Sequence, residues 1–320
     1  MIVITGAAGF IGSCLLARLN AEGFYDIILA DDFSREDKTN NYEGKRFTQT
    51  VERSSFFEWA QDKTRSIQFI FHLGARTDTA EKDPAVFSAL NLDFSKHVWE
   101  FCAAHQIPLV YASSAATYGR GVQGYSDGTA PSLLSPMNLY GKSKNDFDQW
   151  VMAQETSPYF WAGLKFFNVY GPNEYHKGMM ASVVFHAFRQ LQKEGEIRLF
   201  RSHNPEYKDG EQRRDFIYVR DVVDILCFFM HHRKDPGIYN VGTGSARTFL
   251  DLAAALCRSA GHPPRLAFID TPESVRENYQ YYTCAAMEKL RGIGYTAPFR
   301  SLEEGVGEYV KSYLVPGKYF

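Results

Sequence analysis

The sequence predicts an α/β protein with a doubly wound parallel sheet and a smaller, mostly C-terminal second domain. Two observations support this prediction. Short apolar strands alternate with helical segments through the first half of the chain, which is the pattern of βαβ units. A glycine-rich turn, TGAAGFIG, stands between the first strand and the first helix. A turn of this kind in this position is typical of a Rossmann-type sheet.

The predicted elements of the first half follow one another in regular alternation. Each strand is a nearly continuous apolar run, which fits a parallel sheet covered by helices on both faces. The predicted strands lie in the segments IVIT, IILA, SIQFIFHLGA and IPLVYASSA, and the predicted helices cover about residues 10–21, 84–105 and 138–154.

The second half of the chain has a different character. After LKFFNVYG the loops lengthen, and the polar segment 201–213 is expected to be mobile or to close over a ligand. Apolar residues at helical spacing predict two packing helices, TFLDLAAALCRSA and LEEGVGEYVKSYL. We therefore expect a large domain from residues 1–167 plus 215–243 and a smaller one from residues 168–214 plus 244–320.

The overall composition argues against several classes of partner. The 320 residues are 45% hydrophobic and 22% charged, with a formal charge of -2, so neither nucleic acid nor a membrane is expected. The five cysteines are scattered and never spaced as CxxC, so neither disulfides nor a metal site is predicted. Because the chain opens on the strand-like MIVITG without a signal-peptide pattern, we expect a cytoplasmic protein.

The glycine turn predicts a dinucleotide site. Without side chains at Gly6, Gly9 and Gly12, the backbone can approach a pyrophosphate at the positive N-terminus of the following helix. Asp31 follows the second strand and can accept hydrogen bonds from the adenosine ribose, which favours NAD. Arg35 and Lys38 come soon after, and a cation there can pair with the 2′-phosphate of NADP. The sequence leaves both cofactors open.

A tyrosine and a lysine four residues apart predict an acid/base pair. In YGKSK, Tyr140 and Lys144 fall on one face of a helix. A tyrosine pKa is ordinarily near 10, and an ammonium at ~4 Å in an effective dielectric of ~20 supplies about the 4 kcal/mol that brings it near neutrality. The strand end YASSAATYG adds Ser113 and Ser114, which can hydrogen-bond a substrate hydroxyl.

The glycine turn, the serine strand end and the YxxxK helix resemble, in order and spacing, the extended short-chain dehydrogenases/reductases. The segments YASSAATYG, NVYGP, HKGMMASVVFH and RDFIYVRDV make the whole chain similar to the bacterial ADP-L-glycero-D-manno-heptose 6-epimerases. This resemblance implies an epimerase that inverts C6 of the heptose in an ADP-sugar, with tightly held NADP or NAD, during synthesis of the lipopolysaccharide core. We also expect a homo-oligomer.

The resemblance implies a role for individual residues. Tyr140 matches one acid/base and Lys177 a second, while Lys144 matches the cofactor-contacting partner and Ser114 the serine that steadies the reacting hydroxyl. The implied cofactor-binding residues are Gly6, Gly9, Phe10, Ile11, Gly12, Asp31, Asp32, Lys38, Leu73, Gly74, Ala75, Asn91, Lys144, Val169 and Lys177. The implied substrate-binding residues are Ser114, Asn168, Met179, His186, Phe200, Arg201, Ser202, His203, Arg214 and Tyr279.

For Arg214, a physical argument also supports substrate binding, independently of the resemblance. The guanidinium fork of Arg214 matches a pair of diphosphate oxygens. The alternative for Arg214 is a salt bridge with Asp215 or Asp221.

The chain departs from the enterobacterial pattern in three places. GARTDTAEKD at 74–83 replaces a Cys/Ser-rich loop, Met179 stands where a serine is common, and the segment 201–213 is longer. Because all three lie near the expected ligand, the exact sugar and nucleotide stay open.

Three other functions share parts of this pattern. A UDP-hexose 4-epimerase is the main alternative, since it uses the same Ser-Tyr-Lys set but needs no second base like Lys177. A dehydratase is disfavoured, because Ala115 and Ala116 stand where elimination requires two carboxyl groups. A non-catalytic NAD(P)-binding protein need not retain a complete catalytic set, so the intact set favours an enzyme.

Overall fold

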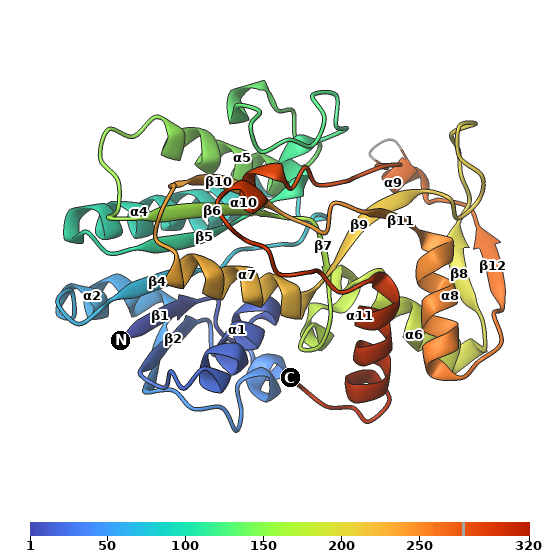
Figure 1. The fold of residues 1–320 in the computed structure, drawn as a ribbon, viewed down its shortest axis with the longest axis horizontal. Coiled ribbons are helices and arrows are strands. Elements are labelled where there is room, and N and C mark those ends of the chain that lie inside the picture. Colours follow the sequence, from blue (N-terminus) through green and yellow to red (C-terminus); the bar gives the residue numbers. More distant parts are fainter. Residues whose placement is uncertain (277–278) are drawn as a thin grey trace.

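The computed structural model describes residues 1–276 and 279–320, and its centre is a seven-stranded parallel sheet (Figure 1). The spatial order of the strands is β10-β6-β5-β4-β1-β2-β3, so the chain winds outward from β1 in both directions. This doubly wound sheet confirms the predicted fold class. Its strands are β1 (Ile2–Thr5), β2 (Ile27–Asp31), β3 (Gln49–Glu52), β4 (Phe69–His72), β5 (Leu109–Ser114), β6 (Trp161–Phe166) and β10 (Gly237–Val241).

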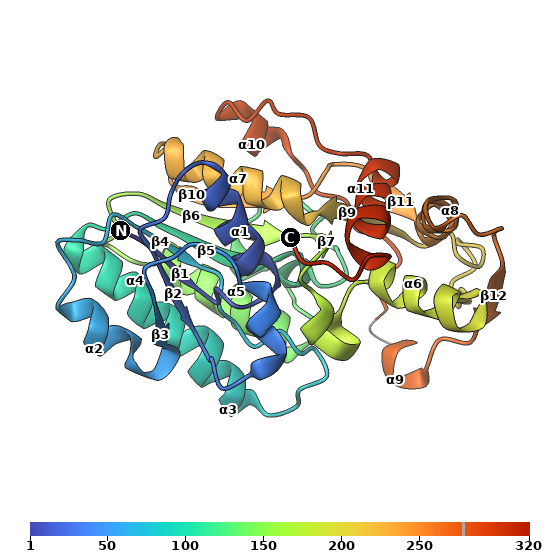
Figure 2. The same cartoon turned by 90° about the horizontal axis from the view of Figure 1, so that it is seen from below.

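Helices cover both faces of the sheet because successive strand residues point to opposite sides. In β1, Ile2 and Ile4 pack into one apolar core while Val3 packs into the other. Different helices cover the two faces, the first pair named below on one face and the others on the opposite face (Figure 2). They are α1 (Phe10–Ala21) and α7 (Val219–His231), and α2 (Phe56–Gln61), α4 (Phe94–His105) and α5 (Leu139–Met152).

The remaining strands form two small sheets outside the large one. One has the order β11-β9-β7 and the other pairs β12 with β8. Figure 1 shows β8, β12 and the two helices beside them at the end of the molecule away from α2. The strands are β7 (Asn168–Tyr170), β8 (Ile197–Phe200), β9 (Arg213–Tyr218), β11 (Ala246–Thr248) and β12 (Leu266–Ile269), and the helices are α6 (Val183–Glu194) and α8 (Phe249–Ala260). The division into two domains stays a prediction.

Short helices and helical turns complete the described chain. The α-helices are α3 (Pro84–Phe87), α9 (Glu273–Arg276), α10 (Glu288–Gly292) and α11 (Leu302–Glu308). The 3-10 and π-helical turns are η1 (Glu36–Asn41), η2 (Arg53–Ser55), η3 (Ser88–Asp93), η4 (Ala115–Tyr118), η5 (Pro131–Leu133), η6 (Tyr175–Met180) and η7 (Tyr309–Leu314). No helix of the described residues has the length and apolar character that crossing a membrane requires.

The structure refines two of the predicted elements. The helix expected over 84–105 consists of α3, the π-helical turn η3 and α4 in direct succession. The helix α5 begins at Leu139 because the side chain of Asn138 accepts a hydrogen bond from the backbone N–H of Gly141 at 2.7 Å. Strand β3 was not predicted, since only Val51 of its four residues is buried.

Candidate active site

Two adjoining cavities lie along the carboxyl edge of the large sheet. The first, of about 460 Å³, lies at the ends of β1, β2 and β4, and the second, of about 350 Å³, at the ends of β5 and β6. Ligands of doubly wound sheets bind at this edge, so the two cavities form one candidate site. The walls that both share are Phe10, Ile11, Leu73, Ala75, Thr77, Lys177 and Met180.

The glycine turn lines the first cavity as predicted. Gly6 has a φ of +70°, and a Cβ there would lie 2.5 Å from the backbone nitrogen of Gly74. A Cβ on Gly12 would lie 2.2 Å from the carbonyl oxygen of Gly6. Within the described chain, no side chain caps the N-terminus of α1, where Gly9 is the N-cap, so N–H groups remain for an anion. These residues fit the pyrophosphate of a nicotinamide dinucleotide.

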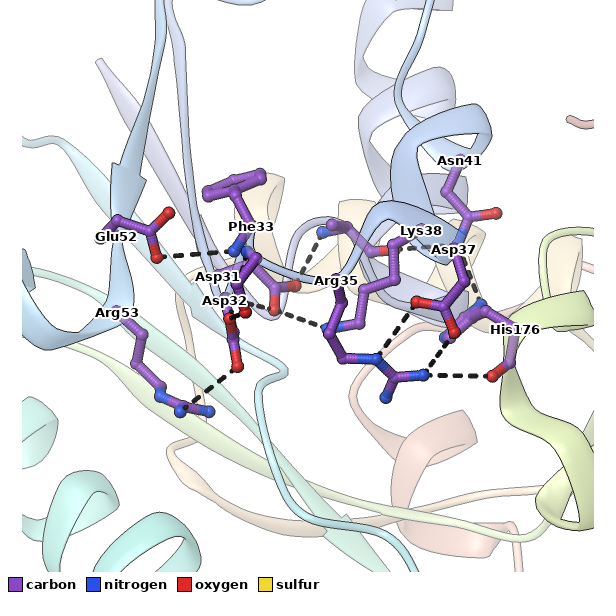
Figure 3. A network of polar contacts seen from close by, with 12 residues as sticks. Asp31, Asp32, Phe33, Arg35, Asp37, Lys38, Asn41, Glu52, Arg53 and His176 are labelled. Carbon is purple, nitrogen blue, oxygen red and sulfur yellow. Dashed lines mark hydrogen bonds and ion pairs between the residues drawn. The ribbon is translucent and has the colours of Figure 1, made fainter.

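Asp31 and Lys38 form a part-buried ion pair in the first cavity. Asp31 lies at the end of β2, where its Oδ2 accepts a hydrogen bond from the N–H of Ala8 at 2.9 Å. Its Oδ1 lies 2.9 Å from the Nζ of Lys38 (Figure 3). Both predicted cofactor residues therefore line the cavity together, and the lysine charge is balanced by the carboxylate.

Asp32, also predicted to bind the cofactor, lies outside both cavities. Its carboxylate accepts hydrogen bonds from Ser34 and lies 3.8 Å from the guanidinium of Arg53 (Figure 3). The hydrogen bond from the Ser34 hydroxyl lowers the pKa of Asp32.

Two arginines also line the first cavity, Arg35, which the sequence offered as a phosphate partner beside Lys38, and Arg53, which it did not. Arg53 directly follows β3, and it went unnoticed because β3 is too polar to be recognised as a strand. Arg35 pairs with Asp37 at 2.5 Å, and its Nη2 donates to the carbonyl of His176 at 3.5 Å (Figure 3). This end of the cavity therefore carries more positive groups than the sequence indicated.

The second cavity contains Ser114, Tyr140 and Lys144. The Nζ of Lys144 donates to the carbonyl of Ala112 at 2.8 Å, and burial lowers the pKa of this lysine to about 8. Burial raises the pKa of Tyr140, and a hydrogen bond with Ser114 opposes that rise. The sequence argument expected Lys144 to lower the pKa of Tyr140. In the protein alone the pKa moves upward, because burial disfavours the phenolate and the ammonium is directed at a carbonyl.

Lys177 lies in the wall between the two cavities. It belongs to η6, and its Nζ is 5.4 Å from the ring centroid of Phe10. Burial lowers the pKa of Lys177, and the charge of Glu174 opposes this shift. Glu174 is fully buried and holds the loop in place, since its carboxylate accepts from the Ser182 hydroxyl at 2.7 Å. The structure therefore brings Lys177 and Tyr140 to the same cavity.

The remaining predicted residues divide between the cavities and other places. Asn168 and Val169 line the second cavity. Asn91 lies outside both, where it accepts from the N–H of Arg76 at 2.7 Å and donates to the Ser143 hydroxyl at 3.0 Å. It therefore ties the loop after β4 to α5. Met179 is 88% exposed, and its carbonyl contacts the Nε2 of His186 at 3.3 Å.

Six predicted substrate residues form a separate cluster near the end of β8, outside both cavities. The ring centroids of Phe200 and Tyr279 are 6.3 Å apart, and the backbone N–H of His203 donates to the hydroxyl of Tyr281 at 3.0 Å. The hydroxyl of Ser202 bonds to the carbonyl of Asn204 at 2.8 Å. The members of this β8 cluster are Phe200, Arg201, Ser202, His203, Arg214 and Tyr279.

Arg214 does not form the salt bridge that was the alternative to ligand binding. Its guanidinium donates to the carbonyl of Arg213 at 2.9 Å and lies 5.4 Å from the ring centroid of Tyr279. Asp215 instead accepts from Thr243, and Asp221 pairs with Arg300. Among the described residues, the buried guanidinium of Arg214 pairs with no carboxylate.

Residues 2–242 match the family described as the NAD dependent epimerase/dehydratase family. The chain belongs to this family. Two curated relatives, each named ADP-L-glycero-D-manno-heptose-6-epimerase, are similar over nearly the full chain. The one from Fusobacterium nucleatum is 45% identical and the one from Nitratidesulfovibrio vulgaris 43% identical, each with 98% of both chains covered.

Solved structures of similar proteins support the same assignment. The ADP-L-glycero-D-manno-heptose-6-epimerase of Helicobacter pylori has a TM-score of 0.81 and 26% identity, covering 97% of this chain and 95% of that chain. The UDP-glucose 4-epimerase of Thermus thermophilus, solved as a complex with NAD, has a TM-score of 0.76 and 26% identity, covering 97% of each chain. The resemblance seen in the sequence and the prediction of a sugar-nucleotide epimerase are confirmed.

Proposed function

We propose that the protein interconverts ADP-D-glycero-D-manno-heptose and ADP-L-glycero-D-manno-heptose, as a step in lipopolysaccharide core synthesis. The observation that carries the proposal is that Tyr140, from a helix, and Lys177, from a loop, line one cavity. Inversion at C6 has a use for two acid/base groups, whereas a 4-epimerase needs no second one. The 45% identity to a relative with this name supports the same substrate.

The proposed mechanism is a transient oxidation at C6. When bound, the nicotinamide cofactor accepts the C6 hydride and later returns it. One of Tyr140 and Lys177 removes the proton of the C6 hydroxyl as the hydride leaves C6, and the product is a planar 6-ketone that can turn in the cavity. The other group donates a proton to the ketone oxygen as the hydride returns to the opposite face. Ser114 steadies the oxygen, and no proton or electron is gained or lost overall.

Two residues are proposed because the two epimers present the C6 oxygen in different directions. A single side chain would be well placed for only one of them, since proton transfer requires hydrogen-bond reach. Lys144 is proposed to contact the cofactor and to supply positive charge beside Tyr140. An oxidised nicotinamide would supply a second positive charge beside Tyr140.

We propose NADP as the preferred cofactor, with Lys38 as the partner of its 2′-phosphate. The family and its NAD-bound member support a nicotinamide cofactor. The phosphate-bearing form is supported by three cations, Arg35, Lys38 and Arg53, in the wall of the first cavity around Asp31. The carboxylate of Asp31 is already engaged by Lys38 and by the N–H of Ala8, so less of it remains for a ribose hydroxyl.

The β8 cluster is proposed to bind the nucleotide part of the substrate. Arg214 is its central cation, and a guanidinium without a carboxylate partner in the described chain is suited to a diphosphate. This proposal assigns residues 168–214 plus 244–320 to a substrate-binding domain and residues 1–167 plus 215–243 to a cofactor-binding domain.

Incubation of the purified protein with single sugar nucleotides tests the substrate assignment. ADP-D-glycero-D-manno-heptose should convert to a mixture with its L-glycero epimer, as followed by proton NMR. UDP-glucose under the same conditions should stay unchanged. Conversion of UDP-glucose without conversion of the ADP-heptose would overturn the proposal in favour of a 4-epimerase.

A further inference from the structure

A charged pair is buried directly behind the second cavity. Asp148 of α5 and Lys165 of β6 lie 3.0 Å apart, and their side chains are 0% and 1% exposed. Burying two charges is costly, and well-packed apolar residues of similar volume are often at least as stabilising. The pair lines neither cavity, so it must act through its neighbours if it serves the site.

Asp148 holds the strand that ends at the catalytic serine. Its Oδ2 accepts a hydrogen bond from the hydroxyl of Ser113 at 2.7 Å, and its Oδ1 accepts from the hydroxyl of Tyr111 at 3.1 Å. Both donors belong to β5, whose last residue is Ser114. A charged acceptor makes these bonds shorter and stronger than neutral ones. The carboxylate therefore fixes the strand from the helix side.

Lys165 holds the same strand end from the other side. Its Nζ donates to the hydroxyl of Thr117 at 2.7 Å, and Thr117 donates to the carbonyl of Ser114 at 2.8 Å. The ammonium also lies 4.9 Å from the ring centroid of Tyr118. The hydroxyl of Thr117 therefore links the backbone of Ser114 to the ion pair by two hydrogen bonds.

Asp148 also faces Lys144. Tyr140, Lys144 and Asp148 are four residues apart along α5 and share one face of it. The Nζ of Lys144 donates to the carbonyl of Ala112, so it lies against the same strand that Asp148 holds. Burial lowers the pKa of Lys144 to about 8, and the charge of Asp148 opposes this fall.

Other ionisable groups around Lys144 do not supply this negative charge. Burial lowers the pKa of His72 to about 3 and raises that of Tyr111, so both are neutral near pH 7. Tyr140 and Tyr118 are likewise neutral phenols, since burial raises their pKa values. Lys165 and Lys177 are amines, and Asp93 of η3 is exposed.

We infer that Asp148, paired with Lys165, is a positioning residue that keeps Lys144 charged and Ser114 in place for the acid/base step. The inference rests on the proposed function, since it assigns a task to residues of that site. Lys144 acts as an ammonium, so its contribution to activity is complete below its pKa and is lost as the pH rises through it. The negative charge of Asp148 raises the pH at which Lys144 loses its proton, so this loss of activity occurs at a higher pH than it would without Asp148.

Two single variants remove the same ion pair and separate its roles. Asp148→Asn removes the negative charge, so the alkaline loss of kcat/KM should move down by about one pH unit. Activity at pH 8 should then fall roughly fivefold, because the protonated fraction of Lys144 drops from about one half to about one eleventh. Lys165→Met leaves the carboxylate beside Lys144, so its alkaline loss should not move downward. A purely structural pair would give both variants the same profile.

A second measurement reads the charge of Lys144 without any sugar nucleotide. Trace acetylation with acetic anhydride at a series of pH values, followed by peptide mass spectrometry, gives the pH at which Lys144 becomes reactive. That pH should fall in Asp148→Asn and not in Lys165→Met. The double variant Asp148→Asn/Lys165→Met removes both charges of the ion pair and should show the lowered pH even if a single variant does not fold.

The outcomes separate this inference from the proposed function. Equal pH profiles in the two single variants, or an unchanged reactivity of Lys144, would overturn the inference. A lowered pH at Lys144 in a protein whose wild type does not turn over the ADP-heptose would support the inference and overturn the proposed substrate instead.

Discussion

At the scale of single residues, burial prepares Tyr140 and Lys177 for complementary tasks. It raises the pKa of the tyrosine and lowers that of the lysine, so both side chains are favoured in their neutral forms. A neutral amine accepts a proton and a neutral phenol donates one. In the direction that starts from these neutral forms, Lys177 acts as the base and Tyr140 as the acid. The reverse direction starts from the ammonium and phenolate that this step leaves, so the tasks are exchanged.

Tyr140→Phe should reduce kcat by about 10²–10⁴-fold, the usual contribution of a positioned acid/base. The ring stays in place, so cofactor binding should survive. Tyr159→Phe is a matched control, because Tyr159 is 69% exposed and should be silent. Rates measured by NMR with the ADP-heptose check this prediction. Activity of Tyr140→Phe within a fewfold of wild type would remove Tyr140 from the mechanism.

Lys177→Met should reduce epimerisation in both directions by a similar factor of about 10²–10⁴, because each direction uses both groups. Binding of NADP, followed by fluorescence titration, should remain. Lys193→Met is the control, since Lys193 is an exposed residue of α6. In a dismutation assay with a shortened aldehyde, Lys177→Met should keep partial activity. Activity of Lys177→Met close to that of Lys193→Met would contradict the role of Lys177.

The sequence predicted some of these residues and not others for physical reasons. Tyr140 and Lys144 were found because helical spacing fixes them on one face. Arg53 was missed because its strand is polar. The direction of the pKa shift at Tyr140 was wrong because burial depends on residues far apart in the chain, which no local motif reports.

At the scale of elements, the contact between the first turn and the first helix is the most constrained part of the cofactor site. Gly12→Ala would place a Cβ 2.2 Å from the carbonyl oxygen of Gly6, with backbone on both sides of the clash. The variant should lose about 1–3 kcal/mol of unfolding free energy and bind cofactor more weakly. Gly292→Ala is the control, since its Cβ would meet nothing within 4 Å among the described residues.

Urea unfolding and a cofactor titration on both glycine variants check this expectation. If Gly12→Ala unfolds at the same urea concentration as Gly292→Ala and binds cofactor equally well, the close approach of turn and helix does not limit the site.

Elements with a strong local pattern were predicted well. Helix α1 begins and ends at Phe10 and Ala21, as expected, because glycines precede it and apolar residues recur along it. The π-helical turn η3 within the helix over 84–105 has no local signal, since its residues read as ordinary helix. Tertiary packing decides such features.

At the scale of the whole molecule, the sheet and the cofactor cleft follow from the strand-helix alternation and the glycine turn. The position of the β8 cluster relative to that cleft does not follow from these patterns, because it depends on where loop 201–213 and the small sheets lie. The cytoplasmic location and the homo-oligomeric state stay predictions from the sequence.

The cofactor preference is a property of the assembled cleft. The protein should purify with NADP or NAD bound, and denaturation followed by mass spectrometry identifies which. Lys38→Ala should lower the ratio of NADP to NAD affinity by about tenfold or more, since a charge-assisted bond is lost. Lys63→Ala, at an exposed site, is the control. An unchanged ratio in Lys38→Ala would remove Lys38 as the phosphate partner.

The central claim is that C6 is inverted by transfer of one hydride to the bound cofactor and back, without exchange with solvent. Epimerisation of the unlabelled ADP-heptose in D2O tests it most directly. NMR and mass spectrometry of the product should show protium retained at C6, because the hydride never meets water. Deuterium at C6 would contradict the account, since it would require removal of that hydrogen as a proton.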